Sequence, residues 1–378
     1  MRIGLIAPPW VPIPPPAYGG TEAIVDNLAR GLTALGHDVR LFTVGESTCP
    51  VRRSYLFEDA FTPIGVAVPE AAHVLAAYAE LDDVDIIHDH TALGPLIGPR
   101  PDGPPVVSTC HGPFDPMNSR NIAHFADRVA VVAVSRDQQR SAAPIPIAAV
   151  IHHGIDLDAY RYGPGGGGFL LFVGRMCSAK GVHRAVEFAQ KAERKLVIVT
   201  KIREAEERQY YEEQVRPLLG PDDPEPRELG LRDRVELMRA ADALINPIDW
   251  PEPFGLVMAE ALACGTPVLA FPSGAAPEIV EHGRTGFLCS DTDSMIEAIE
   301  QAPTIDRRAC RAAAEQRFDM HRMARDYADL YRRILTESAA RETLTTLPTS
   351  VLTGPGLVSL RREKALLGGA SARNSSVL

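Results

Sequence analysis

The sequence predicts an α/β protein of two Rossmann-like domains, each a doubly wound parallel sheet, that face a central cleft. Apolar runs rich in Val, Ile and Leu alternate with helical patterns along the chain. The runs are continuous, which is typical of parallel strands buried on both faces. The alternation stops once, at a turn-rich stretch ending in four glycines, and then restarts. The length of 378 residues also favours two domains.

The first domain is assigned to residues 1–158, and a glycine-rich linker to 159–168. A helix is expected at 21–35, because this stretch has helical rather than strand patterning. Strands are expected where the apolar runs fall, at 2–8, 38–44, 84–89, 105–110, 129–135 and 148–154.

The second domain is assigned to residues 169–318, where strands are expected at 169–174, 195–200 and 243–248, with a helix at 181–192. The last segment, 339–378, loses its periodicity and is rich in Ser, Thr, Gly and Pro, which predicts a disordered tail. Two similar halves predict a cleft bordered by the carboxyl ends of the strands.

Composition narrows the class of protein. The formal net charge of −10 argues against a nucleic-acid binder, which needs clustered Lys and Arg. No run reaches the roughly 18 apolar residues of a membrane span. The six cysteines are scattered without a C-x-x-C pair, so free thiols and a cytoplasmic location are expected.

The stretch EPFGLVMAEALACGTPVLAF (252–271) is almost wholly apolar, yet it contains Glu252 and Glu260. An uncompensated buried carboxylate is costly. Pro253 keeps Glu252 in a loop, and the helix expected from Phe254 or Gly255 points its first N–H groups at an anion in the cleft. Glu260 would lie roughly 7–8 Å further along the helix, near the distance from a diphosphate to a ribose. The alternative is a surface-facing Glu260.

Further groups follow expected strand ends. Arg175 and Lys180, in FVGRMCSAKG (172–181), suit a diphosphate. Gly19 and Gly20 allow close approach of a ligand, although an ordinary turn explains them nearly as well. Neither G-x-G-x-x-G nor a Walker motif is present, which disfavours dinucleotide redox chemistry and ATP hydrolysis. The histidines of HDH (88–90) with His111 could bind a metal, but hydrogen-bonded cleft histidines are the favoured interpretation.

Together these segments resemble the retaining glycosyltransferases of family 4, whose fold is called GT-B. The resemblance covers about residues 1–335. Its most specific part is EPFGLVMAEALACGTPVLA followed by PEIVEHGRTGFL (277–288), similar to the family's E-x7-E signature and the loop after it. VGRMCSAKG, YGGTE and CHG resemble the family's VGR…KG segment, its N-terminal glycine loop and the segment of its active-site histidine.

The resemblance implies transfer of a hexose-type sugar, with retention, from a UDP- or GDP-sugar to a hydroxyl acceptor. No catalytic metal and no cofactor beyond the donor are implied. Glu260 would bind the ribose, Glu252 the transferred sugar, and His111 would line the reaction centre. A C-terminal helix, 319–338, would cross back to the first domain. The donor diphosphate would be held by Arg175, Lys180, Gly19, Gly20 and the backbone of Phe254, Gly255 and Leu256.

The sequence departs from the family pattern in two segments. His153-Gly154 replaces a common Asn-Gly, and a charged helix, KIREAEERQYYEEQ, replaces a glycine-rich turn, so the donor base is not defined. The acceptor is a saccharide, a lipid or a small metabolite, and peripheral membrane contact is compatible with each. The alternatives are a GT-B-type nucleotide-sugar epimerase or hydrolase, and a non-enzymatic sugar-nucleotide binding protein.

Overall fold

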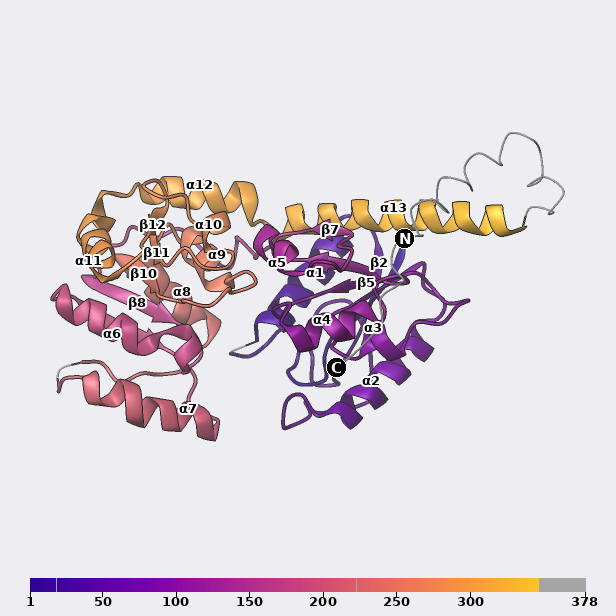
Figure 1. The fold of residues 1–378 in the computed structure, drawn as a ribbon, viewed down its shortest axis with the longest axis horizontal. Coiled ribbons are helices and arrows are strands. Elements are labelled where there is room, and N and C mark those ends of the chain that lie inside the picture. Colours follow the sequence, from indigo (N-terminus) through magenta and orange to yellow (C-terminus); the bar gives the residue numbers. More distant parts are fainter. Residues whose placement is uncertain (18, 222, 347–378) are drawn as a thin grey trace, which may run out of the picture. The chain divides into compact units, whose positions relative to one another are not determined.

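A computed structural model describes residues 1–17, 19–221 and 223–346 (Figure 1). Residues Met1–Tyr331 form one compact unit, and a second unit begins at Arg332. The first unit contains two parallel sheets with their helices, so the predicted fold class is confirmed. No helix in the described part of the chain is long and apolar enough to cross a membrane. All six cysteines are unpaired, as expected.

The first sheet has seven strands in the order β3-β2-β1-β4-β5-β6-β7, and every pairing is parallel. The strand order reverses between β1 and β4, which makes this the topological switch point where ligands bind in such sheets. The edge strand β3 is mostly exposed and was not predicted. The strands are β1 Arg2–Ile6, β2 Asp38–Thr43, β3 Arg52–Tyr55, β4 Ile86–Asp89, β5 Val106–Thr109, β6 Ala130–Ala133 and β7 Ala149–Val150.

The second sheet has five parallel strands in the order β12-β11-β10-β8-β9, with its switch point between β8 and β10. Along β8, Leu170 and Phe172 belong to one buried cluster and Phe169 and Leu171 to another. Both faces of the sheet are therefore covered, which explains the continuous apolar runs. The strands are β8 Phe169–Val173, β9 Lys195–Val199, β10 Ala243–Asn246, β11 Val268–Ala270 and β12 Gly286–Leu288.

The helices cover these sheets, and side chains cap several of them. Asp115 and Asp291 accept hydrogen bonds from the first backbone N–H groups of α4 and α11. The expected charged helix is α7, which continues as a π-helical turn, Tyr211–Val215. The helices are α1 Gly20–Ala34, α2 Ala67–Glu80, α3 Gly94–Ile97, α4 Pro116–Ala123, α5 Arg136–Ser141, α6 Val182–Lys191, α7 Ala205–Tyr210, α8 Leu231–Ala240, α9 Leu256–Ala263, α10 Ala276–Ile279, α11 Thr292–Gln301, α12 Arg307–Arg317 and α13 Met320–Thr346.

Helix α13 packs two fully buried tyrosines against the first sheet. The hydroxyl of Tyr331 lies 2.7 Å from Nδ1 of His88, and the hydroxyl of Tyr327 lies 2.7 Å from Oγ1 of Thr109. The helix was predicted to end at 338, but it continues to Thr346 because residues 339–346 contain neither Gly nor Pro. The rest of the tail predicted at 339–378 lies outside the described residues.

Gly154 lets the chain approach the start of α13 closely. A β-carbon placed on Gly154 would lie 2.6 Å from Met320 Cα and 2.8 Å from Asp319 O. We expect Gly154→Ala to lower the free energy of unfolding by about 1–3 kcal/mol, because backbone must move to relieve the clash. Gly230→Ala is the control, since no atom lies within 4 Å of its added carbon. Urea unfolding that gave the two variants equal stability would contradict this role for Gly154.

Candidate active site

Lys180 and Glu252 form an ion pair at the switch point of the second sheet. Lys180 ends a short 3₁₀ helix, Ser178–Lys180, after β8, and Glu252 lies in the loop after the neighbouring β10. The Lys180 Nζ atom is 2.7 Å from Oε1 and 2.6 Å from Oε2 of Glu252. The two side chains are only 19% and 15% exposed. An ammonium group has three N–H donors, so the pair leaves one for another acceptor.

Arg175 lies in the same loop as Lys180 and is exposed. Its charge helps to lower the pKa of Glu204, which follows the neighbouring strand β9, although the main cause is a hydrogen bond from Lys201. Arg175 is thus at the carboxyl edge of the second sheet, as are Lys180 and Glu252. The Lys180–Glu252 pair and the Arg175 cation thus lie at the sheet edge where the strand order reverses, and such an edge can hold an anionic ligand.

The predicted glycines lie close to the start of α9. Gly255 has a φ of 87°, a left-handed conformation that favours glycine, and α9 begins at the next residue, Leu256. A β-carbon on Gly20 would come 3.4 Å from Leu256 Cδ1, so the loop after β1 reaches this helix. Gly19 has no room for a side chain, because a β-carbon there would lie 2.7 Å from Cβ of Pro15.

Glu260 is compensated by two residues that the sequence did not indicate. The hydroxyl of Tyr160 donates a 2.6 Å hydrogen bond to Glu260 Oε1, and Nη2 of Arg234 lies 4.0 Å from the same oxygen. The Glu260 side chain is 12% exposed, so a surface-facing Glu260 is ruled out. Tyr160 lies in the segment before the second domain and Arg234 on α8. No local pattern in the sequence links them to residue 260.

His111 belongs to a cluster of four imidazoles, which we call the histidine cluster: His88, His90, His111 and His153. His88 lies in β4, and each of the other three follows a strand of the first sheet. The Nδ1 atom of His90 lies 2.9 Å from Nε2 of His111. The His111 and His153 rings are stacked with centroids 5.2 Å apart, and the His153 ring packs edge-on against Phe254, 5.0 Å away. Phe254, directly before Gly255, thus links the cluster to the start of α9.

The histidine cluster is held neutral. Burial lowers the pKa of His111 to about 4, and burial together with the neighbouring imidazoles lowers the pKa of His88, His90 and His153. Within the described residues, no three His, Cys, Asp or Glu side chains are arranged to hold a metal ion. The four rings contact each other by their faces and by a hydrogen bond, so the metal interpretation of HDH with His111 finds no support.

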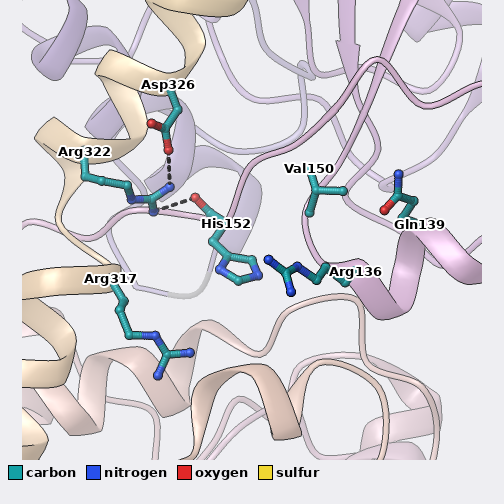
Figure 2. A pocket seen from close by; sticks show the side chains of 7 residues that line it. All are labelled: Arg136, Gln139, Val150, His152, Arg317, Arg322 and Asp326. Atoms are coloured by element: carbon teal, nitrogen blue, oxygen red, sulfur yellow. Dashed lines mark hydrogen bonds and ion pairs between the residues drawn. The ribbon is translucent and has the colours of Figure 1, made fainter.

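A separate pocket of about 380 Å³ is basic (Figure 2). Arg322 donates to the carbonyl of His152 and pairs with Asp326, while the His152 ring and the Arg136 guanidinium point toward one another (Figure 2). His152 also contacts Glu278, on α10, at 2.9 Å. None of the predicted site residues lines this pocket. Its lining consists of Arg136, Gln139, Val150, His152, Arg317, Arg322 and Asp326.

Comparison with known proteins places the fold in a class. The glycosyltransferase AviGT4, involved in avilamycin A biosynthesis, superposes with a TM-score of 0.69 at 26% identity, over 89% of this chain and 98% of that one. The phosphatidyl-myo-inositol mannosyltransferase of Mycobacterium leprae is 25% identical over 90% of this chain and 98% of its own length. The fold therefore belongs to the class of GT-B glycosyltransferases.

Family models identify the family. The model described as Glycosyltransferase Family 4 matches residues 18–159, and Glycosyl transferases group 1 matches residues 168–303. The chain belongs to the family 4 glycosyltransferases. Some curated relatives match over less than half of their length: glycogen synthase of Mycobacterium tuberculosis, 31% identical, is matched over 48% of this chain and 47% of its own.

Proposed function

We propose that this protein is a retaining glycosyltransferase that transfers a hexose-type sugar from a UDP- or GDP-sugar to a hydroxyl acceptor. The observation that carries the proposal is the meeting of Lys180 and Glu252 at one switch point, 2.6 Å apart, with Arg175 in the same loop. A phosphate can take the remaining N–H of Lys180 while Glu252 keeps the other two. Glu252 then lies beside the diphosphate, where the transferred sugar attaches.

In the proposed reaction, the acceptor oxygen bonds to the anomeric carbon as the bond from that carbon to the diphosphate oxygen breaks. The acceptor's proton passes to the departing diphosphate on the same face of the sugar, which gives retention. Arg175 and Lys180 stabilise the charge that develops on the leaving diphosphate. Because these cations supply the neutralising charge, the proposed reaction requires no metal.

Glu260 completes the proposed donor site. It lies on α9 beyond the start of the helix, where backbone N–H groups suit the diphosphate, and its carboxylate can accept from the two ribose hydroxyls. The Tyr160 hydroxyl and Arg234 share Oε1, so Oε2 is the oxygen that stays available for a ribose hydroxyl. Tyr160 and Arg234 would then orient the carboxylate for the nucleotide.

The acceptor is proposed only as a hydroxyl compound. AviGT4 is involved in avilamycin A biosynthesis, and the M. leprae relative is named for a phosphatidyl-myo-inositol acceptor, so these likenesses support both a small metabolite and a lipid. A saccharide is equally compatible with the site. The cytoplasm, where nucleotide sugars are available, is the proposed location.

The proposal is tested by calorimetric titration with UDP-, GDP- and dTDP-sugars in the presence of a chelator. We expect one nucleotide series to bind, and Glu260→Ala to weaken its binding by about 10–100-fold, because hydrogen bonds to a charged group are lost. Glu260→Gln removes the charge, but its side-chain carbonyl can still accept a hydrogen bond from Tyr160. This variant therefore separates a loss of binding from a folding defect. Glu300→Ala is the control, since Glu300 is an exposed carboxylate on α11 of the same domain.

Three results would contradict the proposal. Failure of every nucleotide sugar to bind would favour an unrelated role. Unchanged affinity in Glu260→Ala would reject the donor site. Turnover of donor to an epimer, or to free sugar at a rate that no acceptor increases, would favour the epimerase or hydrolase alternative.

A further inference from the structure

His90 is buried, and it contacts His111 through one ring nitrogen only. It follows β4, and its neighbour in the sheet, β5, leads to His111. Nδ1 of His90 lies 2.9 Å from Nε2 of His111. Nε2 of His90 is fully buried and has no hydrogen-bond partner among the described residues. The side chain is 5% exposed, so solvent does not reach it readily.

Two neutral imidazoles can share this contact in two ways. If His90 donates from Nδ1, its buried Nε2 is an unprotonated lone pair, and His111 carries its proton on Nδ1. If His111 donates from Nε2, His90 must keep a proton on Nε2, where that N–H finds no acceptor. Buried N–H groups without an acceptor are rarer in proteins than acceptors with an unused lone pair. The first arrangement is therefore favoured.

We infer that His90 is a positioning residue that holds His111 in the Nδ1–H tautomer. This inference rests on the proposed function for its catalytic meaning, because His111 is the residue expected to line the reaction centre. His111 then presents an N–H donor, rather than a basic nitrogen, at the atom that His90 does not occupy. His111 is partly exposed, so a ligand can reach this residue.

The assigned tautomer has a chemical consequence. In this tautomer Nδ1 of His111 already carries a proton, and the lone pair of Nε2 accepts the hydrogen bond from His90. His111 therefore has no free basic nitrogen that could take the proton of the acceptor hydroxyl. It can instead donate a hydrogen bond to an oxygen of the transferred sugar. The acceptor's proton must then leave by another route, which agrees with its transfer to the departing diphosphate. His111 thus acts as a neutral hydrogen-bond donor and not as a general base.

His88, the ring next to His90, supports the same state. Both ring nitrogens of His88 are occupied, by Tyr331 and Thr109, and its ring centroid is 4.0 Å from that of His90. A second proton on His90 or His111 would place a cation against these neighbouring rings in a buried site. Hydrogen bonds therefore involve the rings of His88, His90 and His111, and burial disfavours an extra proton among them.

The test is to observe the tautomers in the ligand-free, full-length protein labelled with ¹⁵N-histidine. Two-bond ¹H–¹⁵N spectra separate protonated from unprotonated ring nitrogens, and loss of signals in His111→Gln identifies His111. We expect Nδ1–H to exceed Nε2–H by at least about fivefold at His111. In His90→Leu the ratio is expected to fall several-fold, and in His90→Asn, whose amide N–H can replace Nδ1–H, to recover.

His73→Leu provides the control. His73 is another buried histidine of the first domain, and its Nε2 contacts the carbonyl of Ala7, not the cluster. This change is expected to leave the His111 tautomer as in the wild type. An Nε2–H tautomer in the wild type, or an unchanged ratio in folded His90→Leu, would overturn the inference. The wild-type spectrum can overturn the inference even if His90→Leu does not fold, and independently of any transferase activity; the role of His90 is then tested by His90→Asn, which is expected to keep the wild-type ratio.

Discussion

Replacing Lys180 with methionine is expected to lower donor turnover by about 10²–10³-fold, because one preorganised cation at the leaving diphosphate is lost. Methionine keeps the length of the side chain but removes the charge. Turnover is measured as nucleoside diphosphate released from the donor that the titration identifies. Arg175→Ala is expected to act in the same direction, while donor affinity changes less than turnover in both variants.

Glu252 complicates this result, because Lys180→Met leaves its carboxylate unpaired. The double variant Lys180→Met/Glu252→Gln removes that unpaired charge. If the slow turnover came only from the unpaired carboxylate, the double variant would recover the rate of Glu252→Gln alone. Lys191→Ala is the matched control, since Lys191 is an exposed lysine on α6 of the same domain. Turnover within twofold of wild type in Lys180→Met would reject the assigned role.

Acid is expected to destabilise the protein through its buried histidines. Burial lowers the pKa of His73 and of His111 to about 4, below the usual 6.5. The folded state therefore binds fewer protons than the unfolded state between these values. The stability that they contribute is complete above pH 6.5 and is lost as the pH falls toward 4. Lowering the pH from 7 to 5 therefore reduces the free energy of unfolding by about 2 kcal/mol for each of these two histidines.

Two buried carboxyl groups act in the opposite direction. Burial raises the pKa of Glu22 and of Asp89 to about 7, so the folded state holds their protons below that pH. Going from pH 7 to pH 5, each adds about 2 kcal/mol of stability, which offsets His73 and His111. The pKa values of the remaining members of the histidine cluster are also lowered. These residues therefore make the net change in the free energy of unfolding negative as the pH falls from 7 to 5. The net expectation is lower stability at pH 5.

The measurement is urea unfolding of wild type and His73→Gln at pH 7 and pH 5. The pH-dependent loss in His73→Gln is expected to be about 2 kcal/mol smaller than in the wild type. Glutamine can still donate to the carbonyl of Ala7. His124→Gln is the control, since His124 is exposed and hydrated in either state. An identical pH dependence in wild type and His73→Gln would contradict the burial effect.

Much of the fold could be predicted because buried parallel strands have a distinctive sequence. Residues 169–173 are apolar without interruption, and alternate side chains enter clusters on opposite faces of the sheet. The start of α9 was also predictable, since a glycine next to Pro253-Phe254 marks it. Strand β3, Arg52–Tyr55, was missed because its polar, mostly exposed residues lack the apolar run of a buried strand.

The positions of the candidate site residues at strand ends were predictable, but their contacts were not. Sequence patterns placed Lys180, Glu252 and His111 at strand ends, where the topology then gathers them. The contacts join residues far apart in the chain: 72 positions separate Lys180 from Glu252, and 100 separate Tyr160 from Glu260. Such pairs depend on how helices and strands pack in three dimensions, and a periodic pattern does not report that.

The tyrosines of α13 also affect how a nascent chain is completed. Thr109 contacts the hydroxyl of Tyr327, a residue that is synthesised 218 positions after it. At a synthesis rate of about 5–20 residues per second, the ribosome needs roughly 10–45 s to add that stretch. During this interval the first sheet can form its strands, but Thr109 and His88 lack the hydrogen bonds to the hydroxyls of Tyr327 and Tyr331. The first sheet is therefore translated first, but its buried hydrogen bonds are among the last to form.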